Sequence, residues 1–76
     1  MPRKVFSGSF VISVLVKRFD FLVVSQRGSH VKLKKIGTRG EVVTVVPLHK
    51  ELAPGTLGGV LELAKIDKKE FLAKLK

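Results

Sequence analysis

The sequence predicts an α+β fold in which a helix, a three-stranded antiparallel sheet, a second helix and a short C-terminal helix follow one another. Apolar residues recur at helical spacing toward both ends of the chain. Between these segments lie three runs rich in β-branched residues, separated by short turns that contain glycine. The chain has 76 residues, so we expect one domain over residues 1–76.

The first predicted helix covers residues 7–19. Its β-branched residues would also suit a strand, but the spacing of its apolar residues favours a helix. Ser7 or Ser9 can cap its N-terminus, because a serine hydroxyl accepts a hydrogen bond from a free backbone N–H of the first turn. The apolar residues that share one face of this helix are Phe10, Val11, Val14 and Leu15.

Three strands joined by tight turns are expected at residues 21–26, 29–36 and 41–46. Gly28 provides the first turn, since glycine adopts a positive φ without steric cost. The sequence "GTRG" provides the second turn, and Pro47 ends the last strand because proline has no N–H to donate. Turns this short join antiparallel neighbours, which makes the second strand the middle one.

The middle strand alternates between apolar and polar residues. Val31 and Leu33 would point to one face of the sheet and pack against the helices. The residues expected on the opposite face are His30, Lys32 and Lys34. Because the helices cover only one face, this second face is free to meet solvent or a partner.

Two helices are expected after the sheet. The first begins near Pro54, because proline is tolerated in a first turn. Gly58 and Gly59 weaken it by about 1 kcal/mol each relative to alanine, or permit close packing. Asp67 begins "DKKE", the pattern of a capping box, and opens a short final helix. The apolar residues of the two helices are Leu57, Val60, Leu61, Ala64, Phe71, Leu72 and Leu75.

The charge of the chain indicates what kind of partner it binds. Fifteen lysine and arginine residues stand against six aspartate and glutamate residues, a formal net charge of +9. Such a charge favours a polyanion: nucleic acid first, an anionic membrane or an acidic protein after it. A lysine-rich soluble surface without a charged partner is the alternative interpretation.

The absence of cysteine excludes disulfides, thiolate zinc sites and cysteine nucleophiles. Small secreted domains usually rely on disulfides, so we expect a cytoplasmic protein. The longest apolar stretch falls well short of the roughly 20 residues that span a bilayer. The N-terminus starts basic and then turns apolar, but no signal-peptide cleavage site follows. We therefore expect no membrane-spanning segment, and with nucleic acid as the first choice of polyanion we expect no membrane partner.

Several kinds of active site find no support in the sequence. The acidic residues are scattered, so no carboxylate pair is expected, and no phosphate-cradling P-loop occurs. A metal would have to be held by His30, His49 and a carboxylate, without a closely spaced ligand pair. We expect neither a metal nor a small-molecule cofactor. His49, in "VPLHKEL", is interpreted as a structural histidine that hydrogen-bonds to loop backbone.

The stretch "SQRGSH" at residues 25–30 is the candidate site. Histidine both takes and gives a proton near neutral pH. RNA cleavage requires a base that removes the proton of a 2′-hydroxyl, and cations that stabilise the charge developing on the phosphate. A basic strand with one histidine can also be a passive phosphate contact. His30 is the candidate base, and the cations near it in sequence are Arg27, Lys32, Lys34 and Lys35.

Three short motifs together resemble the HicA (YcfA-like) toxins, and the resemblance runs from about residue 7 to residue 75. The motifs are Gly28-Ser29-His30, Pro47-Leu48-His49 and Pro54-Gly55-Thr56, in this order and with appropriate spacing. One departure is Asp20, which stands where the family usually has a glycine.

This resemblance implies a double-stranded-RNA-binding-like fold and a metal-independent endoribonuclease that cleaves mRNA as the toxin of a type II toxin–antitoxin pair. It implies that His30 is the catalytic histidine, that Gly28 and Ser29 form its turn on the RNA-binding surface, and that a HicB-like antitoxin covers this surface. Two alternatives stay open: a non-catalytic RNA-binding module, and an inactive toxin homologue that only binds an antitoxin.

Overall fold

The computed structural model describes residues 5–38 and 40–75 of the chain. The order of elements confirms the predicted α+β class. Most boundaries lie within one residue of the expected ones; residue 39 of the second turn lies outside the described part. The elements are α1 (Gly8–Phe19), β1 (Leu22–Arg27), β2 (His30–Gly37), β3 (Gly40–Pro47), α2 (Pro54–Leu63) and α3 (Lys68–Ala73). Within the described ranges, no helix has the length and apolarity that crossing a membrane demands.

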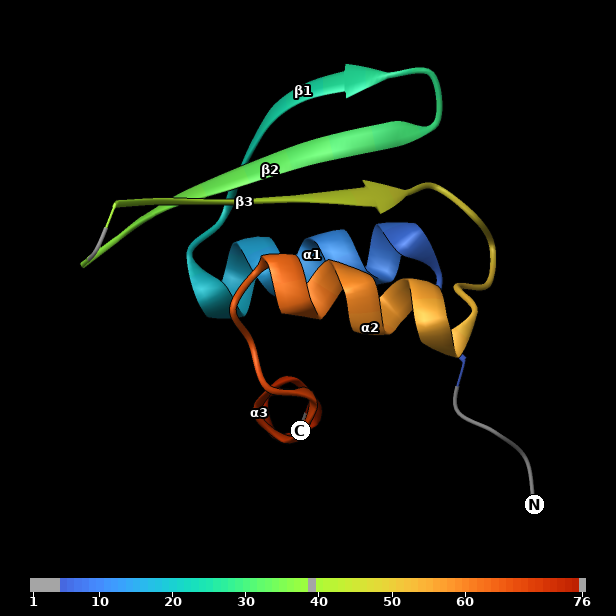
Figure 1. The fold of residues 1–76 in the computed structure, drawn as a ribbon. Coiled ribbons are helices and arrows are strands. Elements are labelled where there is room, and N and C mark those ends of the chain that lie inside the picture. The colour runs from blue at the N-terminus through green and yellow to red at the C-terminus, as the bar shows by residue number, and fades with distance from the viewer. Residues whose placement is uncertain (1–4, 39, 76) are drawn as a thin grey trace.

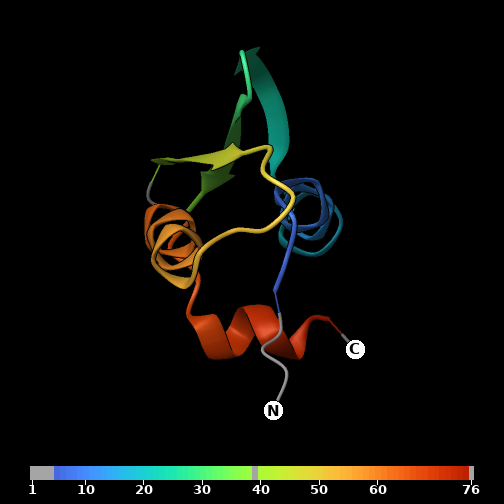
Figure 2. The same ribbon diagram turned by 90° about the vertical axis from the view of Figure 1, so that its right-hand side faces the viewer.

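The sheet has the order β1-β2-β3 with both pairs antiparallel, so β2 is the middle strand as predicted. α1 and α2 lie side by side beneath the sheet (Figure 1). Seen end-on, α3 crosses beneath these two helices, and β1 rises away from them (Figure 2). The core is therefore built between β2 and β3 above and the helices below, with Phe21 and Phe71 fully buried in it.

α1 is fixed at both ends by residues suited to helix termini. Ser7 is the N-cap, and its hydroxyl accepts a hydrogen bond from the backbone N–H of Phe10 at 3.0 Å. Asp20 is the C-cap in the left-handed region, with φ 64°. Aspartate tolerates this conformation better than most residues, although glycine adopts it more easily. This explains how Asp20 stands where the resembling family usually has a glycine.

Phe10 does not lie on the buried face of α1 where the spacing predicted it. Its side chain is exposed and stacks on the ring of Phe6, with 5.5 Å between the ring centroids. The other three residues predicted for this face, Val11, Val14 and Leu15, are buried. Phe10 thus packs on the segment before α1, whose Phe6 in turn contacts Phe71 of the core, rather than on the sheet.

α2 joins the sheet through β3. The buried hydroxyl of Thr44 donates a hydrogen bond to the carbonyl of Val60 at 2.8 Å. The interpretation that Gly58 and Gly59 permit close packing is wrong, because a Cβ at either position would meet no atom within 4 Å.

Asp67 is the N-cap of α3, as expected. Its carboxylate accepts a hydrogen bond from the backbone N–H of Lys69, whereas a capping box would use the N–H of Glu70.

Candidate nucleic-acid interface

A two-residue turn positions His30 at the beginning of β2. Gly28 has φ +59° and Ser29 does not have a positive φ, the pattern of a type II′ hairpin turn. The side-chain amide of Gln26 donates to the Gly28 carbonyl at 3.0 Å. The backbone N–H of Leu48 donates to the Ser29 carbonyl at 2.6 Å. The turn is thus held by β1 on one side and by the segment after β3 on the other.

The middle strand places alternate side chains on opposite faces, as predicted. Val31 and Leu33 are buried against the helices, and His30 and Lys32 are exposed on the outer face. His30 pairs across the strands with Arg27 of β1 and with Pro47 of β3. Directly paired residues have Cβ atoms about 5 Å apart, so the structure brings Arg27 next to His30.

Lys32 extends this cationic surface along the sheet. It lies two residues from His30 on the same face, a separation of about 7 Å along a strand. Its cross-strand neighbours are Ser25 of β1 and Val45 of β3, neither of which is charged. We call Arg27, His30 and Lys32 the turn surface. It carries one guanidinium, one ammonium and one imidazole group, and all three residues are exposed.

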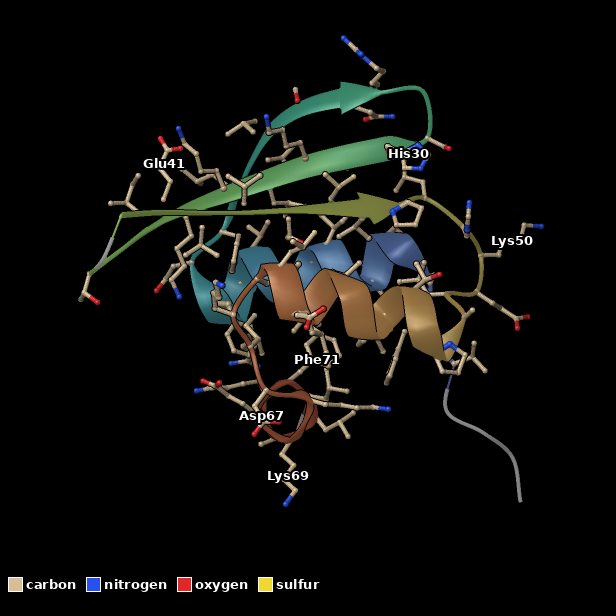
Figure 3. The ribbon with its side chains drawn as sticks, in the orientation of Figure 1. His30, Glu41, Lys50, Asp67, Lys69 and Phe71 are labelled. Atoms are coloured by element: carbon tan, nitrogen blue, oxygen red, sulfur yellow. The ribbon has the colours of Figure 1, made fainter. Side chains whose placement is uncertain are left out.

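Lys34 lies on the same face but further along β2. It is about 13 Å from His30 along the strand, and Figure 3 shows its partner Glu41 far from His30. The ammonium nitrogen of Lys34 forms an ion pair with a carboxylate oxygen of Glu41 at 2.9 Å. Part of its charge is therefore already neutralised.

Lys35 does not join the turn surface. In the alternation of β2 it belongs to the face that carries Val31 and Leu33. Its ammonium nitrogen lies 5.6 Å from the centroid of the buried Phe21 ring, a cation–π contact. The structure thus separates Lys35 from His30, since adjacent strand residues point to opposite faces.

Comparison with known protein families identifies the family of this chain. A family described as the HicA toxin of bacterial toxin–antitoxin systems matches residues 8–66 of the chain. This chain belongs to the HicA toxin family. Membership makes it a toxin with an antitoxin partner, and the family is known for ribonuclease activity. Comparisons with curated proteins and with solved structures give no match.

The HicA chain also contains a close approach that the sequence did not reveal. The N–H of Gly8, the first residue of α1, donates to the carbonyl of His49 at 2.9 Å. A Cβ on Gly8 would overlap the carbonyl oxygen of Pro47, which pairs across the strands with His30. Gly8 therefore lets α1 hold the segment beside the turn surface. A glycine in a helix usually signals only weakness, so no sequence signal marked this one.

His49 is exposed, and its contribution to this contact is its backbone carbonyl. Its side chain forms no hydrogen bond with the residues that the structure describes, so the interpretation as a side chain bonded to loop backbone is wrong. Over residues 5–38 and 40–75, no three histidine, cysteine, aspartate or glutamate side chains gather closely enough to hold a metal ion.

Proposed function

We propose that this HicA toxin is an endoribonuclease that cleaves mRNA at the turn surface. The observation that carries the proposal is the pairing of Arg27 with His30 across a two-residue turn. It combines a group that exchanges a proton near neutral pH with a permanent cation one strand away. We further propose that the toxin acts in the cytoplasm and that a HicB-like antitoxin inhibits it by covering this surface.

The proposed reaction is an attack of the RNA on its own backbone. His30 removes the proton of a 2′-hydroxyl, whose oxygen then bonds to the adjacent phosphorus. The bond from phosphorus to the 5′-oxygen breaks, which leaves a 2′,3′-cyclic phosphate and a 5′-hydroxyl. Arg27 and Lys32 stabilise the negative charge that develops on the phosphate oxygens. The leaving 5′-oxygen takes its proton from water, a lysine or a second subunit, because His30 holds the proton of the nucleophile.

This mechanism requires the 2′-hydroxyl and uses no metal. We expect the purified chain to cleave single-stranded RNA in the presence of EDTA, and to leave the all-deoxy strand of the same sequence intact. The products should carry 5′-hydroxyl ends, which polynucleotide kinase labels without prior dephosphorylation. Cleavage of the deoxy strand, or products with 5′-phosphate ends, would contradict the mechanism.

The two lysines of the outer face should differ in their effect on RNA binding. We expect Lys32→Ala to lower the salt dependence of RNA affinity by about 0.7 in the slope of log K against log salt, the value for one phosphate contact on a single strand. Lys34→Ala should change this slope less, because Lys34 is paired with Glu41. Fluorescence anisotropy over a salt series measures both, with Lys69→Ala of α3 as the control. Equal slopes for Lys32→Ala and Lys69→Ala would show that Lys32 does not contact RNA phosphate at the turn surface.

One observation favours a second candidate function, a non-catalytic RNA-binding module. The His30 side chain forms no hydrogen bond with the described residues, so the chain alone does not orient its imidazole. A catalytic histidine is usually held by a second group. In the proposed enzyme, the bound RNA must supply this orientation. In a binding module no orientation is needed, and His30 is one phosphate contact among several.

A further inference from the structure

The edge strand β1 is exposed over its whole length. All six of its residues are exposed, although three successive ones are aliphatic. The exposed fractions are 69% for Leu22, 51% for Val23 and 47% for Val24. A half-buried strand would hide every second side chain. Here neither face of the strand is covered, and Figure 2 shows β1 rising away from the helices.

The two edges of the sheet differ in this respect. At the β3 edge, Thr44 and Val46 are buried, because α1 and α2 pack against this strand. β1 is held by its pairing with β2. An edge strand presents a row of backbone N–H and C=O groups that can pair with another strand. Native proteins protect such an edge with charged residues, proline or a bulge. Leu22, Val23 and Val24 include no charge and no proline, which leaves the bulge as the protection at these residues.

A bulge limits what can pair with this edge. The register with β2 shifts between Val23 and Ser25, so Val24 is the extra residue. Bulges bend a strand and increase its twist. A twisted edge of six residues suits one short added strand rather than an open-ended stack of strands.

The charges around β1 indicate what kind of molecule pairs with it. Arg27 ends the strand, and Lys17 and Arg18 lie in the last turn of α1, just before it. Asp20 is the one acidic residue between them, so the charge beside the strand is net positive. A second copy of the chain would bring another net charge of +9 to the same place, which is unfavourable. RNA is favoured less than a protein, because β1 has no aromatic side chain on which bases could stack.

We propose that β1 binds an extended, acidic segment of another protein, which adds to the sheet as a fourth strand. Backbone hydrogen bonds along the edge would supply affinity, aliphatic contacts with Leu22, Val23 and Val24 would add to it, and the cations would attract the carboxylates. The antitoxin implied by the family is one protein that can provide such a segment. The inference rests on the exposed edge and its charge, and it does not depend on RNA cleavage.

A short peptide of alternating glutamate and valine is a suitable probe. In a titration followed by amide NMR, we expect shifts confined to β1 and its neighbours on β2, slower hydrogen exchange of β1 amides, and affinity that falls with salt. Val24→Glu should weaken binding by about tenfold or more, because it places like charge against the peptide. Leu63→Glu is the matched control: it makes the same charge change at an exposed aliphatic residue of α2 and should leave binding unchanged.

Four results would overturn the proposal. They are equal weakening by the two variants, shifts that map away from β1, perturbation of β1 by single-stranded RNA but not by the peptide, and a dimer in sedimentation that Val24→Glu dissociates. The last would show that a second copy covers the edge. RNA cleavage by Val24→Glu is measured in parallel, and we expect it to equal that of the unmodified chain. A failure of the edge proposal is thereby separated from a failure of the proposed function.

Discussion

Replacing His30 with alanine is expected to lower the rate of RNA cleavage by about 10²–10⁴-fold, the usual contribution of a general base. The fold should be unaffected, because the side chain is exposed and makes no hydrogen bond with the described residues. Single-turnover cleavage of a labelled RNA measures the rate, and a thermal unfolding curve followed by circular dichroism checks the fold.

His49→Ala is the matched control for this experiment. It removes the other histidine of the chain, which is also exposed and lies just beyond β3. Since the backbone carbonyl of His49 makes its contact with Gly8, the substitution retains this bond and should leave cleavage within a few-fold of the unmodified rate. Equal loss of activity in both variants, or retained activity in His30→Ala, would contradict the assignment of His30 as the general base.

Gly8→Ala is expected to cause the largest loss of stability. The added methyl group would overlap the carbonyl oxygen of Pro47, so either α1 or the end of β3 must move. Overpacking of this kind costs about 1–3 kcal/mol, and sometimes more. A domain of this length has a free energy of unfolding of only about 4–11 kcal/mol. Urea denaturation should show a clearly lower midpoint, and cleavage should fall too, because Pro47 pairs with His30.

Gly58→Ala provides the control for the glycine substitution itself. It lies inside α2, and a Cβ there would meet no atom within 4 Å. Alanine should therefore stabilise the chain by about 0.5–1 kcal/mol, the ordinary difference between the two residues in a helix. If Gly8→Ala and Gly58→Ala shift the urea midpoint in the same direction, the close approach of α1 to Pro47 does not constrain the fold.

The sequence predicted those features that depend on local periodicity. The alternation of β2 identified the buried Val31 and Leu33 and the exposed His30 and Lys32, because a strand turns successive side chains to opposite faces. The same rule, applied one residue further, would have excluded Lys35 from this surface. Proximity in sequence suggested it instead, and the strand geometry separates it from His30.

Features that depend on packing between distant segments could not be predicted. The exposure of β1 follows from where the helices lie, and its aliphatic residues look like those of a buried strand. The role of Gly8 depends on the path of the chain around Pro47, about forty residues later. The pairing of Arg27 with His30 also differs from the expectation. The strands expected at residues 21–26 and 29–36 would leave residues 27–28 as the loop and pair Gln26 with Ser29, whereas the observed loop lies one residue later.

The most direct test of the account is to induce the unmodified chain and His30→Ala, side by side, in a host that lacks the antitoxin. Growth and the integrity of transcripts are measured together, and immunoblotting confirms that both proteins accumulate. The account predicts that only the unmodified chain arrests growth and fragments mRNA. Arrest by both chains with intact transcripts would contradict it in favour of RNA binding without cleavage. Growth with both chains, each folded and abundant, would contradict it in favour of an inactive homologue that only binds its partner.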